Sequence, residues 1–178
     1  EMNSLKVWNH VDTLRAGAEA AARLGRNGFR LGAGSSGSWP AIRAILDAGN
    51  AKMSRDQLLA QNGAPLLIEL GAIEGSESVF AYGPDSRLSG KTFNEGSKVL
   101  QLDYAFHPEL GGATELQVAF EIRHDRGELV WERQTDGSIR QVPAVDRHAF
   151  EQLKTGLTLQ EGEFLVLGPS EQSANEYL

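Results

Sequence analysis

Hydrophobic and polar residues alternate along residues 98–123, and this alternation predicts two long β-strands. Over 100–106 the even-numbered side chains are large and apolar, and the same holds over 116–122. Because successive side chains of a strand point to opposite faces, we expect an antiparallel pair with one apolar and one water-facing side. The intervening residues 107–112 include a proline and two glycines and predict a turn. Four charged residues fall on the expected water-facing side: Asp103, Glu115, Glu121 and Arg123.

The N-terminal part of the chain shows helical patterns instead. An alanine-rich run over 14–24 predicts a helix that ends before Gly28, because glycine suits the left-handed position after a helix. Ser38 is expected to cap a second helix over 41–48, and residues 54–61 are predicted as a third.

The period of two returns in the second part of the chain and predicts further strands. The Asp136-Gly137 dipeptide between two apolar runs is the strongest hairpin signal of the sequence. Residues 146–155 are interpreted as a late helix, with Phe150 and Leu153 facing inward. The other expected strands or extended pieces cover 6–8, 29–31, 66–70, 78–82, 88–93, 129–135, 138–142 and 164–167.

These patterns predict an α+β fold, with a helical N-terminal third followed by a mostly antiparallel β-sheet. A small αβ or helical region is expected over 1–50, and an antiparallel β-rich domain with one late helix over 51–178. The chain has 178 residues and no cysteine. A chain of this length can form a sizeable core without disulfides.

The charge balance bears on the class of partner. The chain has 17 Lys and Arg against 24 Asp and Glu, for a formal net charge of −7. Nucleic acid binding calls for a clustered basic face, which an acidic balance disfavours. No apolar run approaches the roughly 20 residues that span a bilayer. We therefore expect a protein partner or self-association, with no nucleic acid and no transmembrane segment. The chain begins at Glu1 instead of methionine, which makes processing and export a hypothesis.

The sequence Gly32-Ala33-Gly34-Ser35-Ser36-Gly37 matches the G-x-G-x-x-G pattern of dinucleotide-binding loops. In such loops the glycines let the backbone approach a pyrophosphate at a helix N-terminus. A central parallel strand should be a continuous apolar run, and the residues just before Gly32 offer only Phe29 and Leu31. We interpret residues 32–37 as a flexible Gly/Ser connection and expect no cofactor.

Ser35 also lies in an approximate nucleophile elbow, with Asp146 and His148 following in the order of a hydrolase triad. The strand that should precede such a serine is missing, so we interpret Ser35 as a loop residue.

Histidines, glutamates and tryptophans complete the candidate chemistry. The four histidines have no metal-binding spacing and are interpreted as surface or capping residues: His10, His107, His124 and His148. Five glutamates are candidates for a glycosidase-like carboxylate pair: Glu69, Glu109, Glu115, Glu121 and Glu128. For Glu115 and Glu121 we prefer a position on the solvated face of the sheet. Core or boundary packing is expected for Trp8, Trp39 and Trp131, with a partial surface role as the alternative for Trp131. We predict no catalytic, cofactor-binding or metal-binding residue.

The run Leu157-Thr158-Leu159-Gln160-Glu161-Gly162-Glu163-Phe164-Leu165-Val166-Leu167-Gly168 resembles the closing strand of bacterial secretin and secretin-like domains. Residues 116–122 resemble the paired strand before it, and 27–32 are similar to uncharacterised exported bacterial proteins that share this ending. The chain has no Val-Pro-x-Leu-Gly lip motif and no long membrane hairpin. The resemblance implies an envelope-associated protein that assembles with others, and it supplies no functional residue.

Two function hypotheses follow. The first is a non-catalytic interaction or assembly module of the bacterial cell envelope, based on amphipathic strands whose edges can pair with another chain. The alternative is a small hydrolase or ligand-binding enzyme that uses the Gly32–Gly37 loop. We favour the first, because a function must be argued from a site and the sequence assembles none.

Overall fold

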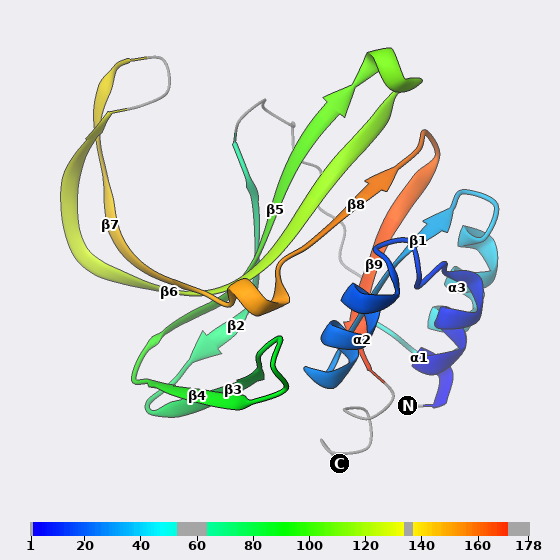
Figure 1. Ribbon diagram of the computed structural model, residues 1–178, viewed down its shortest axis with the longest axis horizontal. Helices are drawn as coiled ribbons and strands as arrows, with labels where there is room; N and C mark the ends of the chain where they lie inside the picture. The colour runs from blue at the N-terminus through cyan, green and yellow to red at the C-terminus, as the bar shows by residue number, and fades with distance from the viewer. Residues whose placement is uncertain (1, 53–63, 134–136, 171–178) are drawn as a thin grey trace.

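The computed structural model describes residues 2–52, 64–133 and 137–170, and most of its elements are strands (Figure 1). In chain order the elements are α1 (Met2–Val7), η1 (Trp8–His10), α2 (Ala18–Arg26), β1 (Phe29–Ser35), α3 (Trp39–Ala48), β2 (Leu66–Ile73), β3 (Glu77–Tyr82), β4 (Leu88–Phe93), β5 (Gly96–His107), η2 (Pro108–Leu110), β6 (Ala113–Arg133), β7 (Ile139–Ala149), η3 (Glu151–Leu153), β8 (Thr155–Leu159) and β9 (Glu163–Pro169).

A five-stranded antiparallel sheet forms the centre of the molecule. Its strands follow the order β2-β5-β6-β7, and β8 pairs with β6 as well. Pairing of β5 with β6 runs without interruption from Ser97 opposite Arg123 to His107 opposite Ala113. Gly111 adopts a φ of 70° in the turn between the two strands. The two long alternating strands and the turn between them are therefore confirmed.

The sheet has the shape of a U (Figure 1). Its longest strand, β6, has 21 residues and pairs with different strands in its first and second parts. Residues 113–123 pair with β5, and 121–133 pair with β7. The register shifts between Asp125 and Leu129, as expected of a bulge that bends a strand. Figure 1 shows two hairpins rising from a common base. We call them the β5–β6 arm (residues 103–117) and the β6–β7 arm (125–133 and 139–145).

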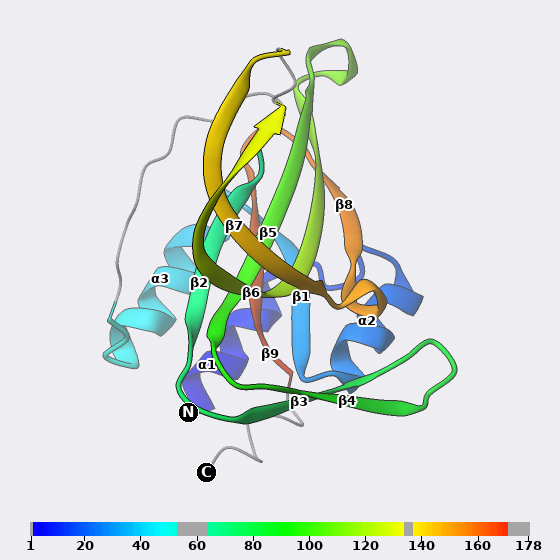
Figure 2. The ribbon, with the colours of Figure 1, turned by 90° about the vertical axis from the view of Figure 1, so that its left-hand side faces the viewer.

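Two small sheets complete the fold. β3 and β4 form a hairpin that lies across the base of the five-stranded sheet, as the view from the side shows (Figure 2). β1 pairs antiparallel with β9, and the three helices lie around this pair on the right of Figure 1.

The core lies between the five-stranded sheet and the β1–β9 pair. Even-numbered residues in the middle of these strands face it, from Leu100 and Leu102 in β5 and from Leu116 to Ile122 in β6. Val118 and Leu24 are its most completely buried large side chains. The other buried members of this cluster are Leu31, Ala33, Ile73, Ala81, Leu100, Phe120, Ile122, Phe150, Leu153, Leu157 and Leu159.

The prediction of a helical N-terminal third is wrong. The described helices are short, with at most 10 residues in α3, and β1 separates α2 from α3. The helix expected over 14–24 begins only at Ala18, because Asp12 and Ala33 form a β-bridge and Gly17 has a φ of 90°. Tertiary pairing thus outweighs the helix propensity of the alanine-rich run. Its predicted end is confirmed, with a φ of 84° at Gly28.

The late helix over 146–155 is also wrong. β7 continues to Ala149, a short 3₁₀ turn follows, and β8 begins at Thr155. This turn brings both Phe150 and Leu153 to the core. The two residues are three positions apart, as on the apolar face of a helix, which explains the wrong prediction. Their inward position is confirmed, at 8% and 4% exposure.

Some of the remaining local predictions are confirmed and others are wrong. The strand expected over 6–8 is wrong, because α1 and η1 occupy that stretch. The strands over 66–70, 78–82, 88–93 and 164–167 are confirmed. The strands on either side of Asp136-Gly137 pair as expected, although Asp136 and the helix predicted over 54–61 lie outside the described residues.

Candidate functional site

A half-buried polar network lies at the base of the U. Nε of Arg123 donates to Oε2 of Glu121 at 2.8 Å, and Nη2 of Arg123 donates to Oε1 of Gln101 at 2.6 Å. Nε2 of Gln101 donates in turn to both carboxylate oxygens of Asp103, at 3.2 and 3.0 Å. Only 13% of the Arg123 side chain and 10% of the Glu121 side chain are exposed. Charge-assisted hydrogen bonds at such a position are strong, so the network holds these four side chains in one arrangement.

A cavity of about 320 Å³ lies beside Arg123, between the two arms. Strands β2, β5, β6 and β7 all contribute to its walls, which comprise Leu67, Glu69, Ser97, Val99, Asp125 and Val145 in addition to Arg123. Oγ of Ser97 donates to Oε1 of Glu69 at 3.0 Å. The cavity therefore offers one paired guanidinium, two carboxylates and three aliphatic side chains, a mixture that suits hydrogen bonding with a chain segment.

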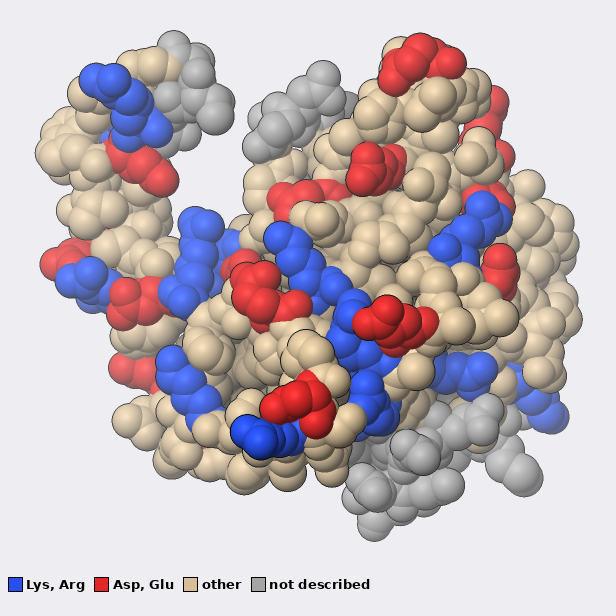
Figure 3. All heavy atoms as spheres, in the orientation of Figure 1, with Lys and Arg blue, Asp and Glu red and all other residues tan. Residues whose placement is uncertain are grey.

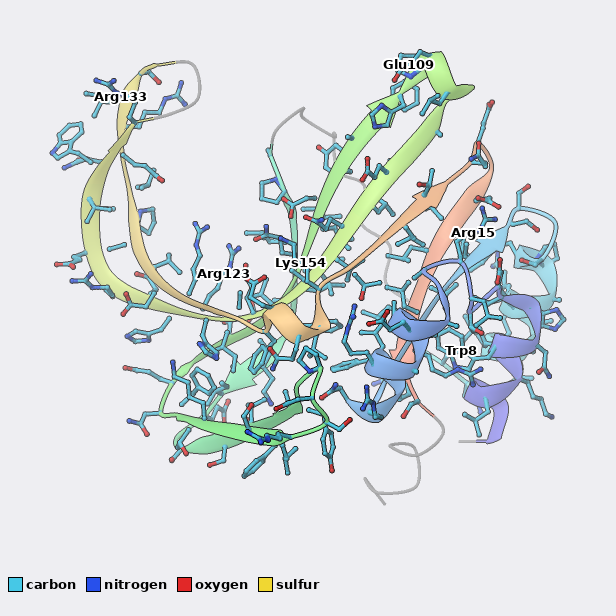
Figure 4. All side chains as sticks on the ribbon, viewed as in Figure 1. Trp8, Arg15, Glu109, Arg123, Arg133 and Lys154 are labelled. Atoms are coloured by element: carbon cyan, nitrogen blue, oxygen red, sulfur yellow. The ribbon has the colours of Figure 1, made fainter. Side chains whose placement is uncertain are left out.

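The two arms frame this cavity. Figure 4 labels Glu109 at the tip of the β5–β6 arm, Arg133 near the end of the β6–β7 arm and Arg123 at the base between them. A backbone hydrogen bond lowers the pKa of Glu109, and a hydrogen bond from the His107 side chain lowers it further. Figure 3 shows acidic and basic groups mixed on this face, with a hollow between the β6–β7 arm and the rest of the molecule.

Two glycines of the G-x-G-x-x-G pattern, Gly32 and Gly34, are required by packing within β1. An ideal Cβ on Gly32 would lie 2.6 Å from the carbonyl oxygen of Asp12. On Gly34 it would lie 2.5 Å from the ring of Phe164. The backbone N–H of Ala33 donates to the carbonyl of Asp12 at 3.1 Å. The interpretation of residues 32–37 as a flexible connection is therefore wrong for 32–35, which form a paired strand.

Ser35 ends β1, and its backbone is bonded to Ser38. The hydroxyl of Ser38 accepts from the N–H of Ser35 at 3.1 Å and donates to its carbonyl at 2.8 Å. Ser38 stands at the N-cap of α3 but makes no side-chain bond to the helix. His148, the predicted alternative partner of Ser35, contacts Lys91, Phe93 and Phe150 instead. The described contacts do not bring the serine and this imidazole together.

Carboxylates lie next to two of the other histidines. Nδ1 of His107 is 2.9 Å from Glu109 and its Nε2 is 3.6 Å from Glu115. Nε2 of His124 is 3.5 Å from Glu95. Within residues 2–52, 64–133 and 137–170, His, Asp and Glu side chains form no group of three or more suited to a metal ion.

Each of the glutamates considered for a catalytic pair has a polar partner, and Glu109 and Glu115 share His107. Besides the contacts already given for four of them, Glu128 pairs with Arg126 at 2.5 Å. Trp8 is buried, as expected, at 8% exposure, with the Arg30 guanidinium 4.8 Å from its ring centre. Trp131 is the most exposed described tryptophan, at 70%.

Sequence reasoning missed the network around Arg123. It placed Glu121 and Arg123 on a water-facing side, whereas both side chains are largely covered. The available signal was the i, i+2 spacing of polar residues in two strands, at Gln101 with Asp103 and at Glu121 with Arg123. The register that sets these pairs side by side, and the curvature that covers them, depend on contacts between distant parts of the chain.

Comparison with protein-family models, with curated proteins and with solved structures gave no significant match. Among the helices of the described residues, none combines the length and the apolar character needed to cross a membrane.

Proposed function

We propose that this chain is a non-catalytic interaction or assembly module, and that the β6–β7 arm is its contact surface. The observation that carries the proposal is the reach of β6 beyond its partner β5. Pairing with β5 ends at Arg123, whereas β6 continues for ten more residues to Arg133 alongside β7 alone.

The arm exposes large apolar side chains over its length. Trp131 is 70% exposed, Leu129 61% and Ile139 57%. By register, Trp131 lies opposite Gln141, two positions from the Leu129–Pro143 pair, so Leu129 and Trp131 share one face of the ribbon. A two-stranded ribbon is marginally stable alone in water, and a row of exposed apolar side chains marks an interaction site. A partner that covers this face would stabilise the ribbon and would bury its exposed apolar side chains.

The backbone of the arm also supports the proposal. Within the described residues, the edge of β6 that β5 covers up to Arg123 has no strand beside it over 125–133. Unpaired N–H and C=O groups on such an edge are a template for a strand of another chain. The partner would therefore be a protein, either a second copy or another chain, and the mixed charges on the face in Figure 3 suit protein contact. The envelope location rests on the secretin-like resemblance alone.

The test compares the wild-type protein with the double substitution Leu129→Ser, Trp131→Ser. We expect the solution mass of the wild type, measured by sedimentation velocity at increasing concentration, to rise above the monomer mass. The double variant should remain monomeric, because its arm has lost two apolar anchors. For a partner of another sequence, the same pair of proteins is compared by cross-linking in the native extract.

Leu14→Ser is the matched control, because Leu14 is 63% exposed and lies far from the arm in the sequence. It should associate as the wild type does. A wild-type protein that stays monomeric at all concentrations and cross-links to nothing would refute the proposal. If the control and the arm variant lose association to the same extent, the assignment of the contact surface to the arm is refuted.

A further inference from the structure

The β3–β4 hairpin crosses the core face of the five-stranded sheet and is fixed at both ends. At one end it meets a row of three residues on neighbouring strands, Lys98, Ile122 and His148. Oε1 of Glu77 lies 2.6 Å from Nζ of Lys98, and Nζ of Lys91 lies 3.3 Å from Nδ1 of His148.

The other end of the hairpin is fixed to α2. Oδ1 of Asn27 accepts from the backbone N–H of Tyr82 at 2.7 Å, and Nδ2 of Asn27 donates to the carbonyl of Tyr82 at 3.3 Å. The hairpin thus spans the sheet between two attachments and does not pack against it everywhere.

A cavity of about 360 Å³ lies under this span. Carbon atoms form most of its walls, which come from β1, β3, β6 and the turn after β7: Phe29, Val79, Phe120, Ile122, Phe150 and Leu153. Leu70, another lining residue, is 50% exposed, so the cavity reaches solvent beside an apolar side chain.

The polar groups of the lining are already partnered. Ser78 and Thr92 share a hydrogen bond of 2.7 Å, the amide of Asn27 is bonded to Tyr82, and the Lys98 ammonium is paired with Glu77. Glu121, which also lines the cavity, is paired with Arg123. A ligand there therefore meets mostly carbon atoms, together with polar side chains that already have partners. A charged ligand would lose its hydration without a new partner, and that loss is costly.

We propose that the cavity beneath β3–β4 binds a small, neutral, apolar molecule, of which a single-ring aromatic compound is the simplest case. Its volume is within the range of roughly 300–1,000 Å³ found for small-molecule sites. An apolar cavity of roughly 150 Å³ is enough to hold benzene in other proteins. This site is separate from the β6–β7 arm, so it stands or falls independently of the proposed assembly function.

Toluene is the probe, with benzoate and benzylammonium as charged analogues of similar size and shape. Binding is followed by methyl NMR, with intermolecular NOEs from the ring protons to the methyl groups of Val79, Ile122 and Leu153. We expect saturable binding of toluene with a Kd of roughly 1 mM or lower. Both charged analogues should bind at least about ten-fold more weakly, in line with the cost of desolvating an unpaired charge. Tighter binding of either charged analogue would overturn the neutral class, and absence of NOEs to these methyl groups at saturating toluene would overturn the site.

Val79→Phe fills the cavity from the hairpin side and keeps a residue that favours strands. Val130→Phe is the same substitution on the β6–β7 arm, outside the cavity lining. Val79→Phe should weaken toluene binding at least about ten-fold, because the ring occupies the space, whereas Val130→Phe should leave it unchanged. Equal binding by the two variants would refute the proposal. If Val79→Phe fails to fold by circular dichroism, the wild-type NOEs decide the question.

Discussion

The aromatic ring of Phe164 lies over the Cα of Gly34, on the neighbouring strand. An ideal Cβ on Gly34 would come within 2.5 Å of Cζ of that ring, and register places the two residues opposite each other in the β1–β9 pair. Trp39 packs edge-on against the same ring, at 5.7 Å between ring centres. The ring therefore has little room to move away, and the glycine is needed for the close approach of two strands.

Gly34→Ala should destabilise the protein by about 1–3 kcal/mol, because the added methyl group overpacks the contact with Phe164. Chemical denaturation with urea measures this change. Gly25→Ala is the matched control, since nothing lies within 4 Å of a Cβ at that position in α2 and alanine favours helices. It should be neutral or slightly stabilising. Equal stability of the two variants would show that Phe164 can give way.

Arg123→Met should destabilise the fold by roughly 1–3 kcal/mol, because it leaves the Glu121 carboxylate largely covered and without its cation. The double variant Arg123→Met, Glu121→Gln should cost less than the sum of the two single substitutions, because the two groups are coupled. Urea denaturation of all four proteins measures the coupling, and simple additivity would contradict it.

The control for this cycle is the exposed ion pair of Arg87 with Asp85, at 88% and 57% side-chain exposure. Arg87→Met should change the free energy of unfolding by less than about 0.5 kcal/mol, because solvent screens such pairs. A loss as large as that of Arg123→Met would mean that burial does not distinguish the two pairs.

Protonation of His148 should weaken the folded state. Burial lowers the pKa of His148, and the Lys91 ammonium lowers it further. As the pH falls below about 6.5, the usual histidine value, the unfolded chain takes up this proton before the folded protein does. The stability present above that pH is therefore lost progressively as the pH falls through the folded-state pKa. Melting temperatures between pH 8 and pH 5, values that bracket the usual histidine pKa of about 6.5, measure the slope.

His148→Phe should reduce this pH dependence, because phenylalanine retains the contact with the neighbouring rings and carries no proton. His10→Gln, at an exposed position, serves as the control and should keep the wild-type slope. An unchanged slope in His148→Phe would assign the pH dependence to other groups.

Asn27→Ala should release the far end of the β3–β4 hairpin, because it removes both hydrogen bonds to the backbone of Tyr82. Amide hydrogen exchange is expected to accelerate in residues 77–93, with little change in the β1–β9 pair. Gln141→Ala, on an exposed position of β7, provides the comparison. Uniform acceleration across the chain would indicate global destabilisation instead.

Much of the sheet could be predicted from alternation alone. The strands around Leu100 and Phe120 have their apolar positions on the face that packs in the core, as period-two reasoning requires. The dihedral preference of glycine correctly placed the end of α2 just before Gly28. These features succeed because they depend on local geometry.

The errors arise where distant residues decide the outcome. Residues around Gly32 form a strand because β9 and Asp12 pair with them, which composition cannot show. Residues 146–155 combine a strand end, a 3₁₀ turn and a new strand, and their apolar spacing resembles a helix. The Arg123 network depends on strand register, because Arg123 donates to Gln101 on the neighbouring strand. The alternation within a single strand therefore predicted, wrongly, that Arg123 faces solvent.

The pairing of β1 with β9 has a consequence for synthesis on the ribosome. Phe29 pairs with Pro169, so β1, the first described strand, is synthesised well before β9, the last described strand, with which it pairs. Closing so long a loop is slow, and the uncovered strand is exposed to wrong partners in the interval. The nascent protein should therefore depend on chaperone protection more than a chain of equal size whose neighbours in sequence are also neighbours in space.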